Sequence, residues 1–288
     1  MNLVRRSVEV ILAGQSPSGA YVACPAFEQY GYAWLRDGCF VADAMREAGE
    51  VESCDRFLDW CARVILARPT GPWDARYTLD GEPDRSDWPK LQIDGLGLFL
   101  GTLRRRGSSR WDGAAALVRT WLEAHWGEPC IDWWEERDGV HATTLWCVGN
   151  GLDSDDIRRE ALARADDRLD ASQLFIGTRE LVERVEESLV SDGYGVHRHA
   201  DDTYYGGGQW LLLTAMYGLA KPECAAGCLA WIEAHARDNG DLPEQARDHL
   251  LHPASYEPWV ERWGMPASPL LWSHAMYLRL HHALRDRR

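Results

Sequence analysis

One short stretch of the chain, Trp133-Trp134-Glu135-Glu136, places two adjacent carboxylates directly behind two indoles. A carboxyl group that packs against apolar aromatic surface loses hydration of its charged form, so its pKa rises. A carboxylic acid that keeps its proton near neutral pH can serve as a general acid. The alternative is an ordinary helix-entry loop, in which the tryptophans are core residues and the glutamates favour the positive end of a helix that begins near His141.

The elements that must position these residues are predicted to be helices. No stretch alternates apolar and polar residues over the length of a strand, whereas apolar residues recur at helical spacing in many segments. The pattern therefore predicts an all-α protein with helices at 2–13, 40–48, 51–67, 94–106, 111–125, 142–150, 155–165, 172–189, 210–219, 223–237 and 269–284. The connections at 14–31, 69–89, 193–208 and 239–263 are predicted to be loops, because Gly, Pro and Asp punctuate them.

The chain of 288 residues is long enough for one large domain or for two small ones. No linker or low-complexity segment divides it, so we expect a single domain that spans residues 1–288. About ten to twelve helices in alternating order can close into a double ring, but periodicity alone does not separate a ring from an open solenoid.

Composition narrows the classes of partner. The net charge of −14 argues against nucleic acid or an anionic membrane surface, and no apolar run approaches the roughly 20 residues of a membrane span. The basic N-terminus is not followed by the apolar region of a signal peptide, and the eight cysteines show no zinc-ligand spacing. We therefore expect a cytoplasmic protein with reduced cysteines and no metal site. The 15 tryptophans include candidates for stacking on sugar rings.

Several loops, taken in order, carry the motifs of one enzyme family. The motifs are Trp34-Leu35-Arg36-Asp37, Trp88-Pro89-Lys90-Leu91-Gln92-Ile93-Asp94-Gly95, Trp134-Glu135-Glu136, Leu169-Asp170-Ala171-Ser172, a loop at 197–210 with Asp202-Thr203-Tyr204-Tyr205, Leu242-Pro243-Glu244-Gln245 and Trp272-Ser273-His274-Ala275. Each motif is weak alone, but their order is specific. From about Tyr30 to its C-terminus, the chain resembles the glucoamylases and related enzymes of glycoside hydrolase family 15. The resemblance implies an (α/α)6 toroid, a double ring of helices, in a compact version with trimmed loops.

The resemblance also implies roles for individual residues. Glu135 is expected to be the general acid and Glu244 the general base of an inverting hydrolysis, whose two carboxyl groups lie roughly 6.5–9.5 Å apart. Arg36 and Asp37 are expected to hold the terminal sugar, whereas Asp94 is explained as well by a helix N-cap as by ligand contact. Trp88 is expected to reach over the acid. The other expected substrate contacts are Trp134, Glu136, Arg198 and Trp210.

These residues also have purely structural interpretations. Glu244 could be a surface residue after a proline turn, and Arg36 with Asp37 could be a local ion pair at a helix start. Glu136 could be a solvated neighbour of the acid, and Arg198 a surface residue. The tryptophans could all belong to the core.

The function that these observations favour is exo-acting, inverting hydrolysis that releases glucose from the non-reducing end of short α-glucosides, such as isomalto- or malto-oligosaccharides. The expected partner is a small oligosaccharide, because the loops are short and no secretion signal is present. No cofactor is expected. One alternative is a sugar-binding (α/α)6 protein without turnover. Another is a different (α/α)6 glycosidase, such as a uronyl hydrolase or a trehalase-like enzyme. The sequence leaves the linkage, the sugar and the oligomeric state, monomer or homo-oligomer, open.

Overall fold

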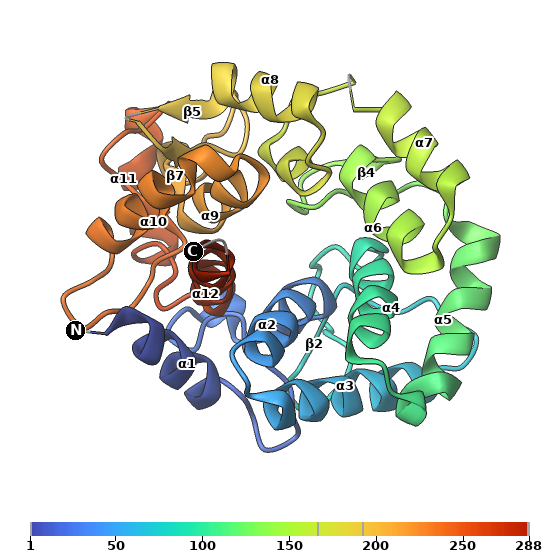
Figure 1. The fold of residues 1–288 in the computed structure, drawn as a ribbon. Coiled ribbons are helices and arrows are strands. Elements are labelled where there is room, and N and C mark those ends of the chain that lie inside the picture. Colours follow the sequence, from blue (N-terminus) through green and yellow to red (C-terminus); the bar gives the residue numbers. More distant parts are fainter. Residues whose placement is uncertain (1, 166, 192, 287–288) are drawn as a thin grey trace. The chain divides into compact units, whose positions relative to one another are not determined.

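Helices make up most of the chain in the computed structural model, which describes residues 2–165, 167–191 and 193–286 (Figure 1). The described α-helices are α1 (Leu3–Ala13), α2 (Leu35–Glu47), α3 (Val51–Leu66), α4 (Asp94–Arg106), α5 (Asp112–His125), α6 (Ala142–Leu152), α7 (Asp155–Ala163), α8 (Arg179–Leu189), α9 (Leu211–Ala220), α10 (Ala225–Ala234), α11 (Tyr256–Trp263) and α12 (Leu271–Arg285). The described strands have two residues each: β1 (Ala33–Trp34), β2 (Arg76–Tyr77), β3 (Cys130–Ile131), β4 (Asp138–Gly139), β5 (Val190–Ser191), β6 (Gly195–Val196), β7 (Gln209–Trp210) and β8 (Gln245–Ala246). None of the described helices is long and apolar enough to cross a membrane.

The chain divides into two compact units. The N-terminal unit consists of Ala13–Ala23 and Gln29–Asp167, and the C-terminal unit of Met1–Leu12, Cys24–Glu28 and Arg168–Arg288. Each unit is described by itself, and the single domain expected from the sequence stays a prediction.

In the N-terminal unit, α2 packs against α3 and α4, α4 packs against α6, and α6 packs against α7 (Figure 1). The contact between α4 and α6 is made by backbone. A Cβ atom on Gly97 of α4 would lie 2.5 Å from the carbonyl oxygen of Cys147, and one on Gly151 of α6 would lie 2.5 Å from the carbonyl oxygen of Gly97. Both positions therefore require glycine, since any larger residue would push the two helices apart.

In the C-terminal unit, α9 packs against α10 and α12. Residues 211–218 of α9 are all buried, in agreement with its almost uniformly apolar sequence. Beside these helices, β5, β6, β7 and β8 form a small antiparallel sheet in that order. Its register pairs Val196 with Trp210 and Trp210 with Gln245, so it joins the loops that the sequence analysis expected at 193–208 and 239–263.

Several predicted boundaries were wrong. The helix expected at 172–189 is a 3₁₀ turn at Ala171–Phe175 followed by α8, because Gly177 takes a left-handed φ of 74° and Thr178 caps α8. The loop expected at 239–263 ends in the helix α11, where Pro258 lies in the first turn and its missing N–H is not needed. The helix expected from residue 40 begins at Leu35.

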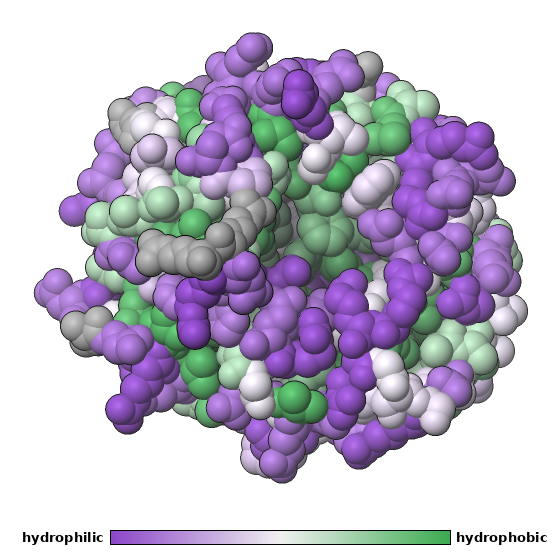
Figure 2. All heavy atoms as spheres, viewed as in Figure 1, coloured by the Kyte–Doolittle hydropathy of each residue, from purple (hydrophilic) through white to green (hydrophobic). Residues whose placement is uncertain are grey.

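Hydrophilic residues cover most of the face shown in Figure 2. The large apolar side chains that are exposed within the described residues are Leu12, Val51, Leu66, Leu162 and Met265. Their scatter along the chain is ordinary for a folded protein and marks no apolar patch.

Candidate active site

Glu135 lies in the turn between the paired strands β3 and β4. Asp132 organises this turn, because its Oδ1 accepts hydrogen bonds from the backbone N–H groups of Glu136 at 2.7 Å and Arg137 at 3.2 Å. Glu135 itself has a φ of 63°, in the left-handed region that residues other than glycine rarely adopt. Such strain persists where surrounding contacts enforce it, and it is common at functional sites.

Both oxygens of the Glu135 carboxylate are held by indole N–H groups. Trp34 Nε1 donates to Oε1 at 2.6 Å, and Trp88 Nε1 donates to Oε2 at 2.7 Å. The side chain is only 8% exposed. Trp88 thus reaches the acid as expected, but Trp133 packs against Phe40, with ring centroids 5.8 Å apart, and is a core residue. The indoles whose N–H groups hold the carboxylate therefore come from distant loops, at Trp34 and Trp88.

Arg36 lies among three carboxylates in the same unit. It is 3.3 Å from Asp37 (Nε to Oδ1), 3.6 Å from Asp94 (Nη1 to Oδ2) and 3.6 Å from Glu135 (Nη2 to Oε1). Burial raises the pKa values of Asp37 and Asp94 to about 6, because Arg36 only partly offsets their loss of hydration. Burial alone would lower the pKa of Arg36, but the three carboxylates raise it above its usual value.

This cluster goes beyond a local ion pair at a helix start, because Arg36 joins α2 to α4 and to the Glu135 turn. Asp94 is the first residue of α4 and accepts a hydrogen bond from the N–H of Gly95, whereas the N-cap position is occupied by Ile93. The N-cap interpretation of Asp94 was therefore wrong.

A second buried arginine, Arg76, supports Trp88. Its guanidinium carbon lies 3.9 Å from the ring centroid of Trp88 and 5.2 Å from that of Trp34. Its Nε donates to Asp84 Oδ2 at 2.8 Å and its Nη2 donates to Ser86 Oγ at 3.1 Å. Burial disfavours the charge of Asp84, but hydrogen bonds from Ser86 and Arg76 outweigh it and hold its pKa well below the usual value. Sequence reasoning missed this network, since its members lie in a loop without periodicity.

Trp134 and Glu136 flank the acid. Trp134 is half-buried, and Glu136 is exposed. The exposure of Glu136 fits both a solvated neighbour and a residue that meets a ligand.

In the C-terminal unit, the small sheet brings together Arg198, Trp210 and Glu244. Arg198 follows β6, Trp210 is in β7, and Glu244 directly precedes β8. The backbone N–H of Leu211 donates to the carbonyl oxygen of Glu244 at 3.2 Å, and the N–H of Glu244 donates to the carbonyl oxygen of Ala267 at 2.8 Å.

Glu244 is only 1% exposed, so its interpretation as a surface residue after a proline turn was wrong. Glu244 contributes to the raised pKa values of two neighbouring groups. Burial and then the charge of Glu244 raise the pKa of Tyr205 to about 12. Burial, with a smaller contribution from Glu244, raises the pKa of Cys24 to about 11.

Arg198 is also buried, which excludes the surface interpretation. Its Nε and Nη2 donate to the two oxygens of Asp202 at 2.8 and 2.7 Å, in the bidentate geometry of a strong pair. The guanidinium carbon lies 5.0 Å from the ring centroid of Trp210 and 5.2 Å from that of Tyr204. Arg198 therefore orients two aromatic rings beside Glu244. Both carboxylate oxygens of Asp202 accept hydrogen bonds from Arg198.

Comparisons with known proteins agree on one family. The model of glycosyl hydrolases family 15 matches residues 1–174. Isomaltose glucohydrolase of Kribbella flavida is 36% identical, over 96% of this chain and 91% of its own length. A solved glycosidase structure is 34% identical with a TM-score of 0.86, and covers 98% of this chain and 96% of its own. A bacterial glucoamylase in complex with acarbose has a TM-score of 0.77 at 19% identity, over 99% of this chain and 56% of its own.

These likenesses extend over nearly the whole chain and confirm the fold class that the motifs implied, an all-α protein of the (α/α)6 toroid type. The ordered tryptophan, arginine and glutamate motifs, the buried carboxylate between two indoles and the similarity at 36% identity lead to one assignment. The chain belongs to glycosyl hydrolases family 15 and is a glycoside hydrolase.

Proposed function

We propose that this protein is an exo-acting, inverting glycosidase that releases glucose from the non-reducing end of short α-glucosides. The observation that carries the proposal is the Glu135 carboxylate, which is buried, strained in φ and held at both oxygens by indole N–H groups. A carboxyl group fixed in this way is held in one defined position, as proton transfer to a bound substrate requires.

In this proposal, Glu135 protonates the oxygen of the leaving group. Glu244 takes a proton from the water that attacks the anomeric carbon from the opposite face. Inverting hydrolysis by a pair of carboxyl groups requires a separation of roughly 6.5–9.5 Å. A single catalytic domain over residues 1–288 is part of the proposal. Arg36 and Asp37 hold hydroxyls of the terminal glucose through charge-assisted hydrogen bonds.

The remaining contacts in the proposal are aromatic and polar. Trp134 and Trp210 are proposed as walls of the first sugar site, and Trp88 as the cover over the acid. Glu136 and Arg198 are proposed to contact sugar hydroxyls, Glu136 on the side of the leaving sugar.

Short substrates are supported by two findings. The relative from Kribbella flavida is named for isomaltose, a disaccharide, and a related solved glycosidase is in complex with glucose. The alignment with the former spans 355 positions although this chain has 288 residues, so the relative carries insertions that this chain lacks. Fewer insertions leave fewer loops to build sites for further sugars.

A cytoplasmic location is part of the proposal. All eight cysteines are free within the described part of the chain, and seven of them are buried. Reduced thiols suit a reducing compartment.

The decisive experiment follows the anomer that appears first when isomaltose, maltose and trehalose are each mixed with the protein, by proton NMR. Inversion predicts that β-glucose is released first, whereas initial α-glucose would exclude it. Glu135→Gln and Glu244→Gln should each lower kcat by about 10²–10⁴-fold, because each removes one proton-transfer group.

A matched control is Glu257→Gln in the exposed first turn of α11, which should leave kcat unchanged. A loss of less than tenfold from Glu244→Gln would remove Glu244 from the role of base. Saturable sugar binding without any hydrolysis would instead favour the alternative of a binding protein. A preference for unsaturated uronides or for trehalose would favour the other (α/α)6 glycosidases.

A further inference from the structure

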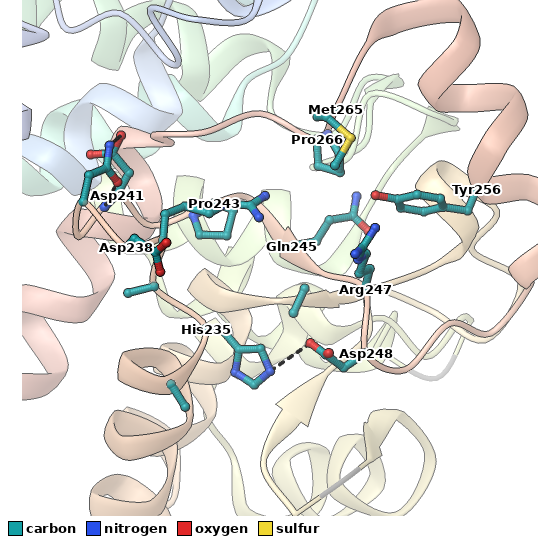
Figure 3. A pocket seen from close by; sticks show the side chains of 15 residues that line it. His235, Asp238, Asp241, Pro243, Gln245, Arg247, Asp248, Tyr256, Met265 and Pro266 are labelled. Carbon is teal, nitrogen blue, oxygen red and sulfur yellow. Dashed lines mark hydrogen bonds and ion pairs between the residues drawn. The ribbon is translucent and has the colours of Figure 1, made fainter.

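A cavity of about 620 Å³ lies in the C-terminal unit, beside the segment that carries Glu244 (Figure 3). Its walls come from the end of α10, the connection that follows it, the first residue of α11 and Met265–Pro266. This volume is within the roughly 300–1,000 Å³ of sites that bind small molecules.

The cavity lies on the other face of the base-carrying strand. Successive side chains of an extended segment point to opposite faces. Pro243, Gln245 and Arg247 line the cavity, as do Ala246 and Asp248 further along the segment, whereas Glu244 is not among its lining residues. A ligand in the cavity would therefore contact the neighbours of Glu244 and not the carboxylate itself.

Two buried polar groups at this cavity have no hydrogen-bond partner within the described residues. The Gln245 side chain accepts a hydrogen bond at Oε1 from the N–H of Gly208 at 3.1 Å, which leaves its Nε2 as the unpaired end. The hydroxyl of Tyr256 is the second group. The two residues are 4% and 7% exposed, and Figure 3 shows their polar ends pointing toward one another. Buried donors are normally paired, so this arrangement points to a ligand that supplies the partners.

The charges around the cavity are mixed. Arg237 and Arg247 contribute positive charge, and Asp238, Asp241 and Asp248 contribute negative charge. Asp241 is already paired with Arg6, whose Nη2 lies 2.7 Å from its Oδ1. His235 also lines the cavity, and its Nε2 lies 3.2 Å from Asp248 Oδ2, as the dashed line in Figure 3 marks. An anion would meet the aspartates and a cation would meet the arginines, so a neutral ligand with many hydroxyls fits best.

Apolar surface completes the site. Pro243, Met265 and Pro266 present C–H groups to the same cavity as the polar side chains. Sugar rings offer matching C–H faces between hydroxyls that both donate and accept hydrogen bonds. We propose that this cavity is a second saccharide site, which binds a neutral mono- or disaccharide through Gln245, Tyr256 and Arg247. The proposal goes beyond the hydrolytic site and does not depend on its mechanism.

The test uses the full chain with Glu135→Gln, labelled with 5-fluorotryptophan and followed by 19F NMR. The ring of Trp231 stacks on His235 with centroids 3.9 Å apart, so its resonance reports on the cavity, while that of Trp88 reports on the acid. Substitution by phenylalanine assigns each resonance. Titration with glucose, isomaltose and maltose should shift the Trp231 resonance saturably.

Tyr256→Phe removes only the unpaired hydroxyl and should weaken the Trp231 titration about fivefold, with the Trp88 titration unchanged. Arg247→Ala, at an exposed position, should weaken it further. Tyr194→Phe is the matched control, because Tyr194 belongs to the same unit but does not line the cavity, and it should change neither titration.

Three outcomes would overturn the proposal. The first is a Trp231 resonance that no sugar shifts. The second is a titration that Tyr256→Phe and Arg247→Ala leave unchanged. The third is saturation by inorganic phosphate but by no sugar, which would make the cavity an anion site. Failure of hydrolysis in the earlier experiment would leave the Trp231 titration interpretable, so the two proposals fail separately.

Discussion

Replacement of Arg76 by methionine tests whether the acid is positioned through Trp88. Arg76 is 5% exposed and pairs with Asp84, which is equally buried, while its guanidinium lies over the rings of Trp88, Tyr32 and Trp34. Methionine keeps an unbranched apolar side chain but removes the charge and the donors. Arg76→Met should therefore free the indole of Trp88 without opening a large cavity.

Two magnitudes follow from these contacts. Breaking a buried ion pair from one side costs about 3–5 kcal/mol of the free energy of unfolding. Arg76→Met should lie at the lower end of this range, because Ser86 and Lys90 still contact the buried Asp84 carboxylate. Removing the hydrogen bond from Trp88 to Glu135 costs about 1.5–3 kcal/mol, the range for bonds to charged groups. If that bond is retained in the transition state, kcat/KM should fall about 10- to 160-fold.

The assay combines urea unfolding with steady-state kinetics on the best substrate. Asp84→Asn added to Arg76→Met should recover part of the lost stability, since the buried carboxylate that has lost its main partner is then neutral. Trp88→Phe should lower kcat/KM by a similar factor, and the double variant Arg76→Met/Trp88→Phe should be no worse than either single variant. Arg159→Met, at an ion pair with Asp156 in which both side chains are exposed, serves as the control and should change little.

Normal kcat/KM in a folded Arg76→Met protein would refute this reasoning. Multiplicative losses in the Arg76→Met/Trp88→Phe variant would also refute it, because they would show that Arg76 acts through another route.

Two further predictions concern the helices around the acid. Burial raises the pKa values of Asp37 and Asp94 to about 6. Between about pH 4 and pH 6 the folded protein therefore retains protons on these carboxyl groups that the unfolded chain releases. As a result, these two groups make the free energy of unfolding fall as the pH rises through this window. Asp94→Asn should flatten that slope in urea titrations at pH 4, 5, 6 and 7, and an unchanged slope would contradict the assignment. Gly97→Ala should cost about 1–3 kcal/mol or more in the same assay, since its Cβ would meet the α6 backbone 2.5 Å away. Gly113→Ala, where a Cβ meets nothing within 4 Å, should not destabilise the protein.

The sequence predicted the helices well where one face of a helix is buried along its whole length. The bounds of α3, α4 and α5 differ from the predicted ones by at most one residue, because apolar spacing is a local property. The elements that it missed depend on single residues or on distant partners. A left-handed Gly177 ended one predicted helix, and α11 is short and contains a proline.

The candidate site was predictable in its residues but not in its contacts. The order of the motifs singled out Glu135 and Glu244 from the other acidic residues of the chain. In the structure the side chains of both are buried in loops. The partners of Glu135 are 101 and 47 residues away, at Trp34 and Trp88. No local pattern connects these positions, so the hydrogen bond from Trp34 could not be read from the sequence. Arg76 and Asp84 lie in an irregular loop and carry no motif at all.

The strain at Glu135 shows that this turn is constrained by more than the side chain proposed as the acid. A left-handed φ on a residue other than glycine costs about 1–3 kcal/mol, so the turn must be held by other contacts. Asp132 supplies them, since its carboxylate accepts from the two N–H groups that follow Glu135, and its own carbonyl oxygen accepts from Gln92 Nε2 at 2.6 Å. Gln92 in turn lies two residues before Asp94, at the start of α4. The loop that carries Glu135 is therefore tied to the helix that carries part of the Arg36 cluster. The residue proposed to donate the proton and those proposed to hold the sugar are thus fixed by one set of contacts within the N-terminal unit.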